Sequence, residues 1–111
     1  MIAKLSKGGS FGGAVQYIFG PGKDADCLAG MGVLFKDTPS IIRGFERQAA
    51  QNPRVSKPVG HVVLSFSPRD AARLNNRLLL SIAVEYLDRM GIKDTQLIIV
   101  RHRDREHPHL H

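Results

Sequence analysis

Apolar side chains follow a helical period in three segments of the chain. In each segment they recur every three or four residues, which places them along one side of an α-helix. A threonine followed by a proline, Thr38-Pro39, offers the second segment an N-cap and a first helical residue. Helix-ending residues follow each segment, with Gly91 after the third. The pattern therefore predicts helices over Phe11–Phe19, Thr38–Asn52 and Leu78–Met90.

Short runs rich in β-branched and other apolar residues predict four strands. The glycine-rich segment Ser6–Ser10 is expected to end the first strand, and Arg101–Glu106 to form a charged connection after the last one. Strands that alternate with helices predict an α/β two-layer sandwich, and the pattern leaves open whether neighbouring strands run parallel or antiparallel. The predicted strands are Met1–Leu5, Cys27–Met31, Val59–Phe66 and Thr95–Val100.

Charge and cysteine content narrow the class of protein. The 111 residues carry 16 Lys and Arg against 10 Asp and Glu, a net charge of +6 that attracts nucleic acid or an anionic membrane surface. Cys27 is the single cysteine and cannot form an internal disulfide, which fits a cytoplasmic rather than a secreted protein. The sequence contains neither an apolar run of membrane-spanning length nor the apolar centre of a signal peptide. We expect a cytoplasmic protein without membrane insertion.

Four of the five histidines fall within the last ten residues. His109 and His111 are two residues apart, and alternate residues of a strand point to the same face, so both rings can bind one metal ion. A turn after His102 can bring that residue beside them as a third ligand. Three neutral imidazoles leave coordination positions open on a divalent cation, as a catalytic metal site requires. The alternative is a solvated, histidine-rich tail or a cloning tag.

The C-terminal string HRDREHPHLH, residues 102–111, resembles the metal motif of the relaxases, the mobilisation nucleases that nick DNA for conjugation. Relaxases belong to the wider HUH (His-hydrophobe-His) endonucleases. The opening MIAKLSKGGSFGGAVQYIFG is similar to the family's first motif. The segment KPVGHVVLSF, followed by a long helix and QLIIVRHRD, is similar to its central part. The resemblance spans nearly the whole chain.

The resemblance implies roles for individual residues. His102, His109 and His111 match the three metal ligands of the family. Tyr17 matches the nucleophilic tyrosine of the first motif, and Asp104 matches the acidic position inside the metal motif, so both are predicted to be catalytic.

Two further histidines each have two interpretations, and the second tyrosine has a structural one. His61 on the predicted central strand is either a base or hydrogen-bond partner near Tyr17, or a histidine satisfied within the core. His107 lies beside the ligands or on the DNA side, and its alternative is a solvated loop histidine. Tyr86 lies on the apolar side of the long helix and is expected in the core.

Family membership would imply an α+β fold, a two-layer sandwich with a mainly antiparallel central sheet and helices packed on it. Relaxases continue past the last histidine, so residues 1–111 are expected to form one relaxase-like nuclease domain that is incomplete at its C-terminus. The implied cofactor is a divalent metal ion, Mn²⁺ or Mg²⁺ in first place, with Zn²⁺, Co²⁺ and Ni²⁺ as alternatives. The implied partners are single-stranded DNA of a transfer origin and other proteins of the relaxosome.

Arginines at helical spacing add candidate DNA contacts. Arg43 and Arg47 are four residues apart, and Arg69, Arg73 and Arg77 repeat at the same interval. Each set is expected to form a stripe along one helical side. With this net charge, contact with DNA phosphates is the functional interpretation, and a solvated face is the alternative.

The implied reaction is a transesterification in which Tyr17 attacks a DNA phosphodiester, leaving a 5′-phosphotyrosyl link and a free 3′-hydroxyl. Because a phenol is a weak nucleophile at neutral pH, the reaction needs a base or a nearby positive charge. Two alternatives stay open. One is an HUH replication initiator or transposase, whose tyrosine usually lies C-terminal to the histidine pair. The other is a non-catalytic fragment that binds DNA or metal.

Overall fold

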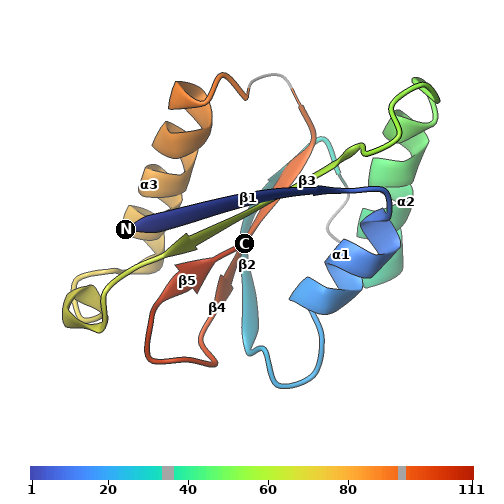
Figure 1. The fold of residues 1–111 in the computed structure, drawn as a ribbon. Coiled ribbons are helices and arrows are strands. Elements are labelled where there is room, and N and C mark those ends of the chain that lie inside the picture. The colour runs from blue at the N-terminus through green and yellow to red at the C-terminus, as the bar shows by residue number, and fades with distance from the viewer. Residues whose placement is uncertain (34–36, 93–94) are drawn as a thin grey trace.

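An antiparallel sheet of five strands runs through the part of the chain that the computed structural model describes, residues 1–33, 37–92 and 95–111 (Figure 1). The strand order is β1-β3-β5-β4-β2. The α+β fold with an antiparallel sheet is therefore confirmed. The strands are β1 (Ile2–Gly8), β2 (Ala25–Met31), β3 (Val59–Ser65), β4 (Leu97–His102) and β5 (His109–Leu110), and the helices are α1 (Phe11–Ile18), α2 (Thr38–Ala49), the short 3₁₀ helix η1 (Pro68–Asp70) and α3 (Asn76–Arg89).

The helices are divided between the two faces of the sheet. Neighbouring residues of a strand point to opposite faces, and Ile98 of β4 packs with Val15 and Phe45 of α1 and α2. Its neighbour Ile99 packs instead with Leu79 of α3. The sheet is thus a middle layer, with α1 and α2 on one face and α3 on the other, rather than one layer of two (Figure 1). Within the described ranges, no helix has the length and apolar character needed to cross a membrane.

The glycine-rich segment after the first strand differs from the expectation that Ser6–Ser10 is a loop. β1 continues to Gly8, because it pairs with β3 at each position of the strand. This pairing overrides the low strand propensity of glycine. Ser10 then caps α1, its hydroxyl accepting a hydrogen bond from the Gly13 N–H at 3.0 Å. The chain passes from strand to helix within two residues.

Capping groups set the ends of the other helices. Asp37, rather than the predicted Thr38, is the N-cap of α2, and its carboxylate accepts a hydrogen bond from the Ser40 N–H at 2.8 Å. At the far end of α3, Gly91 has φ of 74°, a left-handed conformation that glycine adopts without strain. The predicted end of α3 is therefore confirmed.

The predicted single stripe of Arg69, Arg73 and Arg77 is wrong. Asn75 caps α3, its side-chain oxygen accepting the Leu78 N–H at 2.8 Å, so the helix begins after most of the stripe. Arg69 lies in η1 and Arg73 in the turn that follows, while Arg77 lies in the first turn of α3. Helical spacing therefore does not align the three side chains.

The last two strands form a hairpin at the centre of the sheet. β4 runs to His102, so Arg101 belongs to the strand and the predicted charged connection starts at Arg103. His102 pairs with His109 across the hairpin. The pairing continues at Val100 and His111, which exchange backbone hydrogen bonds of 2.8 and 2.7 Å. The hairpin holds the histidine-rich segment between β3 and β4.

Replacing Leu79 by alanine should lower the free energy of unfolding by about 3 kcal/mol, because its side chain is fully buried (0% exposed) in the α3 face of the core. The adjacent Leu78→Ala is the matched control, since Leu78 is 42% exposed and its loss should cost less than about 1 kcal/mol. Urea unfolding monitored by circular dichroism measures both. Equal costs for the two variants would contradict the packing of α3.

Candidate metal centre

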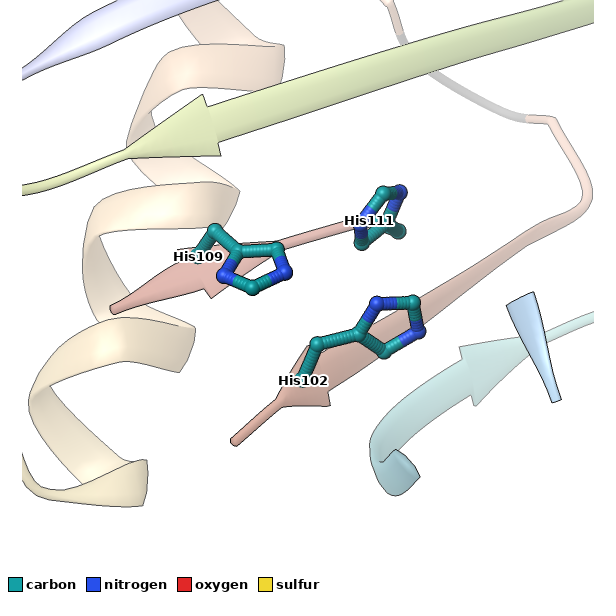
Figure 2. Close-up of side chains that lie close together, drawn as sticks. All are labelled: His102, His109 and His111. Carbon is teal, nitrogen blue, oxygen red and sulfur yellow. The ribbon is translucent and has the colours of Figure 1, made fainter. Parts of the chain in front are cut away.

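Three histidine side chains converge on the face of the β4–β5 hairpin that carries α1 (Figure 2). His102 ends β4, His109 begins β5 and His111 directly follows β5. One ring nitrogen from each lies within 4.8 Å of the others. His102 and His109 are buried and His111 is half-buried. The predicted arrangement is confirmed, with two rings on one face of a strand and a third beside them from the neighbouring strand.

Backbone carbonyls orient two of the three rings. The Nε2 of His102 donates to the Ile18 carbonyl at 2.7 Å, and the Nδ1 of His109 donates to the His107 carbonyl at 2.9 Å. A carbonyl oxygen can only accept, so these nitrogens carry the protons of the neutral rings. The lone pairs of His102 Nδ1 and His109 Nε2 are therefore left for a metal ion. Such outer hydrogen bonds are what metal-binding histidines normally make.

The third ring is oriented by another histidine. The Nε2 of His61, on β3, lies 2.9 Å from the Nδ1 of His111. When His111 donates in this bond, its Nε2 keeps the lone pair, as in the other two rings. His61 thus lies next to the histidine cluster, in contact with one member, rather than isolated in the core.

Asp104 adds a carboxylate to the three imidazoles of the cluster. Its Oδ1 lies 3.3 Å from the Nε2 of His109, with the two side chains 16% and 10% exposed. Two lone pairs at this distance repel each other unless a proton or a metal ion lies between or beside them. Three imidazoles and a carboxylate are a donor set that suits divalent transition metals. The residues present therefore fit such an ion.

The electrostatics of the cluster favour the form that binds a metal. Burial, with the neighbouring His102 and His61 as smaller causes, lowers the pKa of His111 to about 3. Burial also lowers the pKa of His61 and of His102. An apolar cavity of about 340 Å³ lies between β3 and β4 and is lined in part by His61 and His111. Near neutral pH these rings are uncharged, which is the state that coordinates a metal.

The pKa of the Asp104 carboxyl group is also lowered, which favours its charged form. Partial burial acts to raise its pKa, but a hydrogen bond from its own N–H and the nearby His109 and His102 together lower it. The lowered pKa favours the anionic form of Asp104 beside the histidines.

Tyr17 lies beside this cluster. It occupies the last turn of α1, its side chain is 51% exposed, and its ring centre is 6.2 Å from that of His111 and 6.4 Å from that of His61. The next residue, Ile18, provides the carbonyl that holds His102. A phosphate group approaching Tyr17 from solvent would therefore also face the histidines.

Lys23 is a residue of this site that the sequence reasoning missed. Its ammonium lies over the Tyr17 ring, 4.3 Å from the ring centre. The segment Lys23–Asp26 reads as a polar link, and the available signal was a lysine six positions after Tyr17, beyond the Gly20-Pro21-Gly22 turn. A turn of this kind can bring the residues that follow it back beside the end of the helix.

The remaining histidine and tyrosine have mainly structural contacts. His107 is exposed, its Nδ1 lies 3.2 Å from the Phe66 carbonyl, and its own carbonyl orients His109. Tyr86 is half-buried and packs against the core cluster of α3, as expected.

The candidate DNA-contacting arginines are distributed over both faces of the sheet. Arg43 and Arg47 are exposed on α2, where Arg43 donates to the Ser40 hydroxyl at 3.2 Å. Arg73, at the opposite side of the molecule, pairs with Asp70 at 3.1 Å with both side chains largely exposed. An exposed pair of this kind contributes little to stability.

Comparison with known proteins gives a match to a family model. The sequence profile described as "Relaxase: MobA/VirD2-like, nuclease domain" matches residues 17–111, a range that begins at Tyr17 and ends at His111. Neither a curated protein nor a solved structure matches the chain.

Acid should destabilise the metal-free protein. The pKa of His111 is about 3 in the folded chain and returns to about 6.5 on unfolding, so between these values the unfolded chain binds more protons and stability falls as the pH falls. Because the side chain is half-exposed, screening reduces the loss from pH 7 to pH 5 to about 1 kcal/mol. His61 and His102 act in the same direction.

Urea unfolding with a chelator present, at a series of pH values, measures this loss. His111→Gln removes the titrating ring and should flatten the profile between pH 5 and 7. A profile as steep as that of the unchanged protein would contradict the assignment to His111.

Proposed function

The chain belongs to the relaxases with a MobA/VirD2-like nuclease domain, and from this premise we propose that residues 1–111 act as one nuclease domain that nicks a single DNA strand by transesterification. The observation that carries the proposal is the position of Tyr17, whose ring centre is 6.2 Å from that of His111 at the edge of the histidine cluster. A nucleophile and a phosphate-activating centre must share one face of the protein, and the proximity of Tyr17 to the histidines supports the proposal.

In the proposed reaction the phenolic oxygen of Tyr17 attacks the phosphorus of a DNA phosphodiester. A new oxygen–phosphorus bond forms, and the bond from phosphorus to the 3′ oxygen breaks. The phenol loses its proton to a base or to water, and the departing 3′ oxygen takes one up. The products are a 5′-phosphotyrosyl link and a 3′-hydroxyl, so the phosphodiester bond is conserved and the reaction can reverse.

His102, His109 and His111 are the proposed metal ligands. A divalent ion held there would polarise the non-bridging oxygens of the phosphate. The chain itself fixes the rings: the carbonyls of Ile18 and His107 hold two of them at 2.7 and 2.9 Å. We propose Mn²⁺ or Mg²⁺ as the working ion, while the imidazole donors also suit Zn²⁺, Co²⁺ and Ni²⁺.

His61 and Asp104 are the remaining proposed members of the catalytic group. Because His61 Nε2 is engaged with His111 at 2.9 Å, we assign His61 to orienting that ligand rather than to removing the proton of Tyr17. Asp104, as an anion 3.3 Å from His109, balances the charge of the cation and is the better candidate to receive a proton, through water.

The proposed substrate is single-stranded DNA from a transfer origin, bound in the cytoplasm together with other relaxosome proteins. The net charge of +6 favours DNA in general through contacts with phosphate. Among the candidate contacts Arg43, Arg47, Arg69, Arg73 and Arg77, those on α2 share the sheet face of the histidines.

Metal binding should depend on His109 and His111 together. We expect the His109→Ala, His111→Ala double variant to lose at least about 100-fold in affinity for Mn²⁺ or Zn²⁺, because a single imidazole remains. His107→Ala is the matched control, since the His107 Nδ1 contacts the Phe66 carbonyl, and the backbone carbonyl of His107, which orients His109, is retained. Isothermal titration calorimetry measures each affinity. Unchanged binding in the double variant would place the ion elsewhere.

Tyr17→Phe should abolish the covalent protein–DNA adduct while changing metal affinity and DNA affinity less than about threefold, because it removes one exposed hydroxyl group and no charge. The assay incubates the protein with Mn²⁺ and single-stranded DNA from its own transfer origin and resolves the adduct on a denaturing gel. Tyr86→Phe is the control and should retain the adduct. An adduct that persists in Tyr17→Phe would assign the nucleophile to another residue.

The same assay separates the alternatives. Metal and DNA binding without any nick would favour a non-catalytic binding protein. Cleavage through a tyrosine other than Tyr17 would favour the arrangement of replication initiators and transposases.

A further inference from the structure

The ammonium group of Lys23 lies over the ring of Tyr17, the proposed nucleophile, 4.3 Å from the ring centre. We propose that Lys23 binds the phosphate group that Tyr17 attacks and continues to hold it in the phosphotyrosyl product. This inference rests on the proposed function, and it concerns a residue that neither the metal motif nor the tyrosine motif includes.

The position of Lys23 is fixed by its loop. Gly22 has φ of 78° and Asp24 has φ of 46°, so the backbone on both sides of Lys23 adopts the left-handed conformation. The Lys23 N–H donates to the Gly20 carbonyl at 3.3 Å, and the Asp24 carbonyl accepts from the Arg103 N–H at 3.4 Å. The loop is thus attached to the end of α1 and to the end of β4.

The register of β2 strengthens this attachment. Ala25, two residues after Lys23, pairs with His102 across the sheet. The backbone that precedes Lys23 leaves the helix that carries Tyr17, and the backbone that follows it joins the strand that carries a proposed metal ligand. Lys23 therefore connects the nucleophile to the histidine cluster through short, hydrogen-bonded segments.

The ammonium group is placed among the groups of the site. It lies 4.3 Å from the centre of the Tyr17 ring and is half-buried. An ammonium on a flexible four-carbon stem can move from the ring face to an oxygen bound at the ring edge.

The proposed reaction develops negative charge that a nearby cation can stabilise. As the phenolic oxygen bonds to phosphorus, negative charge is shared by the non-bridging phosphate oxygens. A cation close to the phenol can balance part of this charge. The ammonium of Lys23, 4.3 Å from the centre of the Tyr17 ring, is such a cation.

The first test requires neither DNA nor metal. Phosphotyrosine incorporated at position 17 places a phosphate monoester where the proposed product carries a phosphodiester, and the half-exposed Tyr17 side chain can carry it without disturbing the core. Urea unfolding is measured for the chain with tyrosine or phosphotyrosine at this position, each with Lys23 or with Lys23→Gln. We expect the two changes to be coupled by about fivefold in the unfolding equilibrium constant, and the coupling to vanish in about 1 M salt.

Lys7→Gln is the matched control for this cycle. Lys7 is exposed, and it pairs with Gly60 while its neighbour Ser6 pairs with His61, so its side chain points to the face opposite His61. The Lys7→Gln variant removes the same charge as Lys23→Gln and should give no coupling to the phosphate. Lys23→Arg retains the charge and should keep most of the coupling. Absence of coupling at Lys23, or equal coupling at Lys7, would overturn the proposal.

A second measurement follows the reaction itself. At saturating DNA, Lys23→Gln should slow single-turnover adduct formation by more than about tenfold while weakening DNA binding less than threefold, and Lys23→Arg should restore most of the rate. Adduct formation without coupling in the phosphotyrosine cycle would refute the role of Lys23 and leave the proposed function standing. Coupling without any adduct in the unchanged protein would refute the proposed function and leave the phosphate contact of Lys23 standing.

Discussion

The antiparallel pairing of His102 with His109 is the constraint on which the site depends. It fixes the register of the central hairpin, and the two hydrogen bonds between Val100 and His111 extend that register by one more position. Because side chains alternate along a strand, a shift of one residue would turn two of the three rings to the α3 face of the sheet. The convergence of three imidazole nitrogens within 4.8 Å is thus a property of backbone pairing, and side-chain contacts then refine it.

The environment of the hairpin determines the chemical state of these rings. On one side lies an apolar cavity between β3 and β4, which disfavours protonation of His61 and His111. On the other side lie charged groups of the loops, Asp104 and Lys23, close to solvent. The cluster therefore stands at a boundary between a low-dielectric interior and an exposed surface that a large anionic substrate can reach. The proposed metal ligands and the proposed nucleophile, Tyr17, both require such a boundary.

Much of this arrangement could be predicted from the sequence. The period of the apolar residues gave the three main helices, and the spacing of His109 and His111 gave a shared face of one strand. The resemblance to relaxases added Tyr17, which by its apolar neighbours alone reads as a core residue. The contacts that could not be predicted join segments far apart in the chain: His61 with His111, Ile18 with His102, and Lys23 with Tyr17. Local pattern does not encode such contacts, because strand order and loop course decide them. The arginine stripe failed for the opposite reason, since the Asn75 cap starts α3 later than a regular spacing suggests.

The bond from His102 to the Ile18 carbonyl joins the proposed ligand set to a helix that is weak by itself. α1 has eight residues, among them Gly12 and Gly13, and glycine in a helix costs about 1 kcal/mol relative to alanine. Such a helix opens locally at little cost unless its ends are held, and the His102 ring holds its last turn. Local opening of α1 would therefore release the His102 ring. Any ligand that immobilises the His102 ring would also reduce the excursions of Tyr17, the proposed nucleophile, and so lower its conformational entropy.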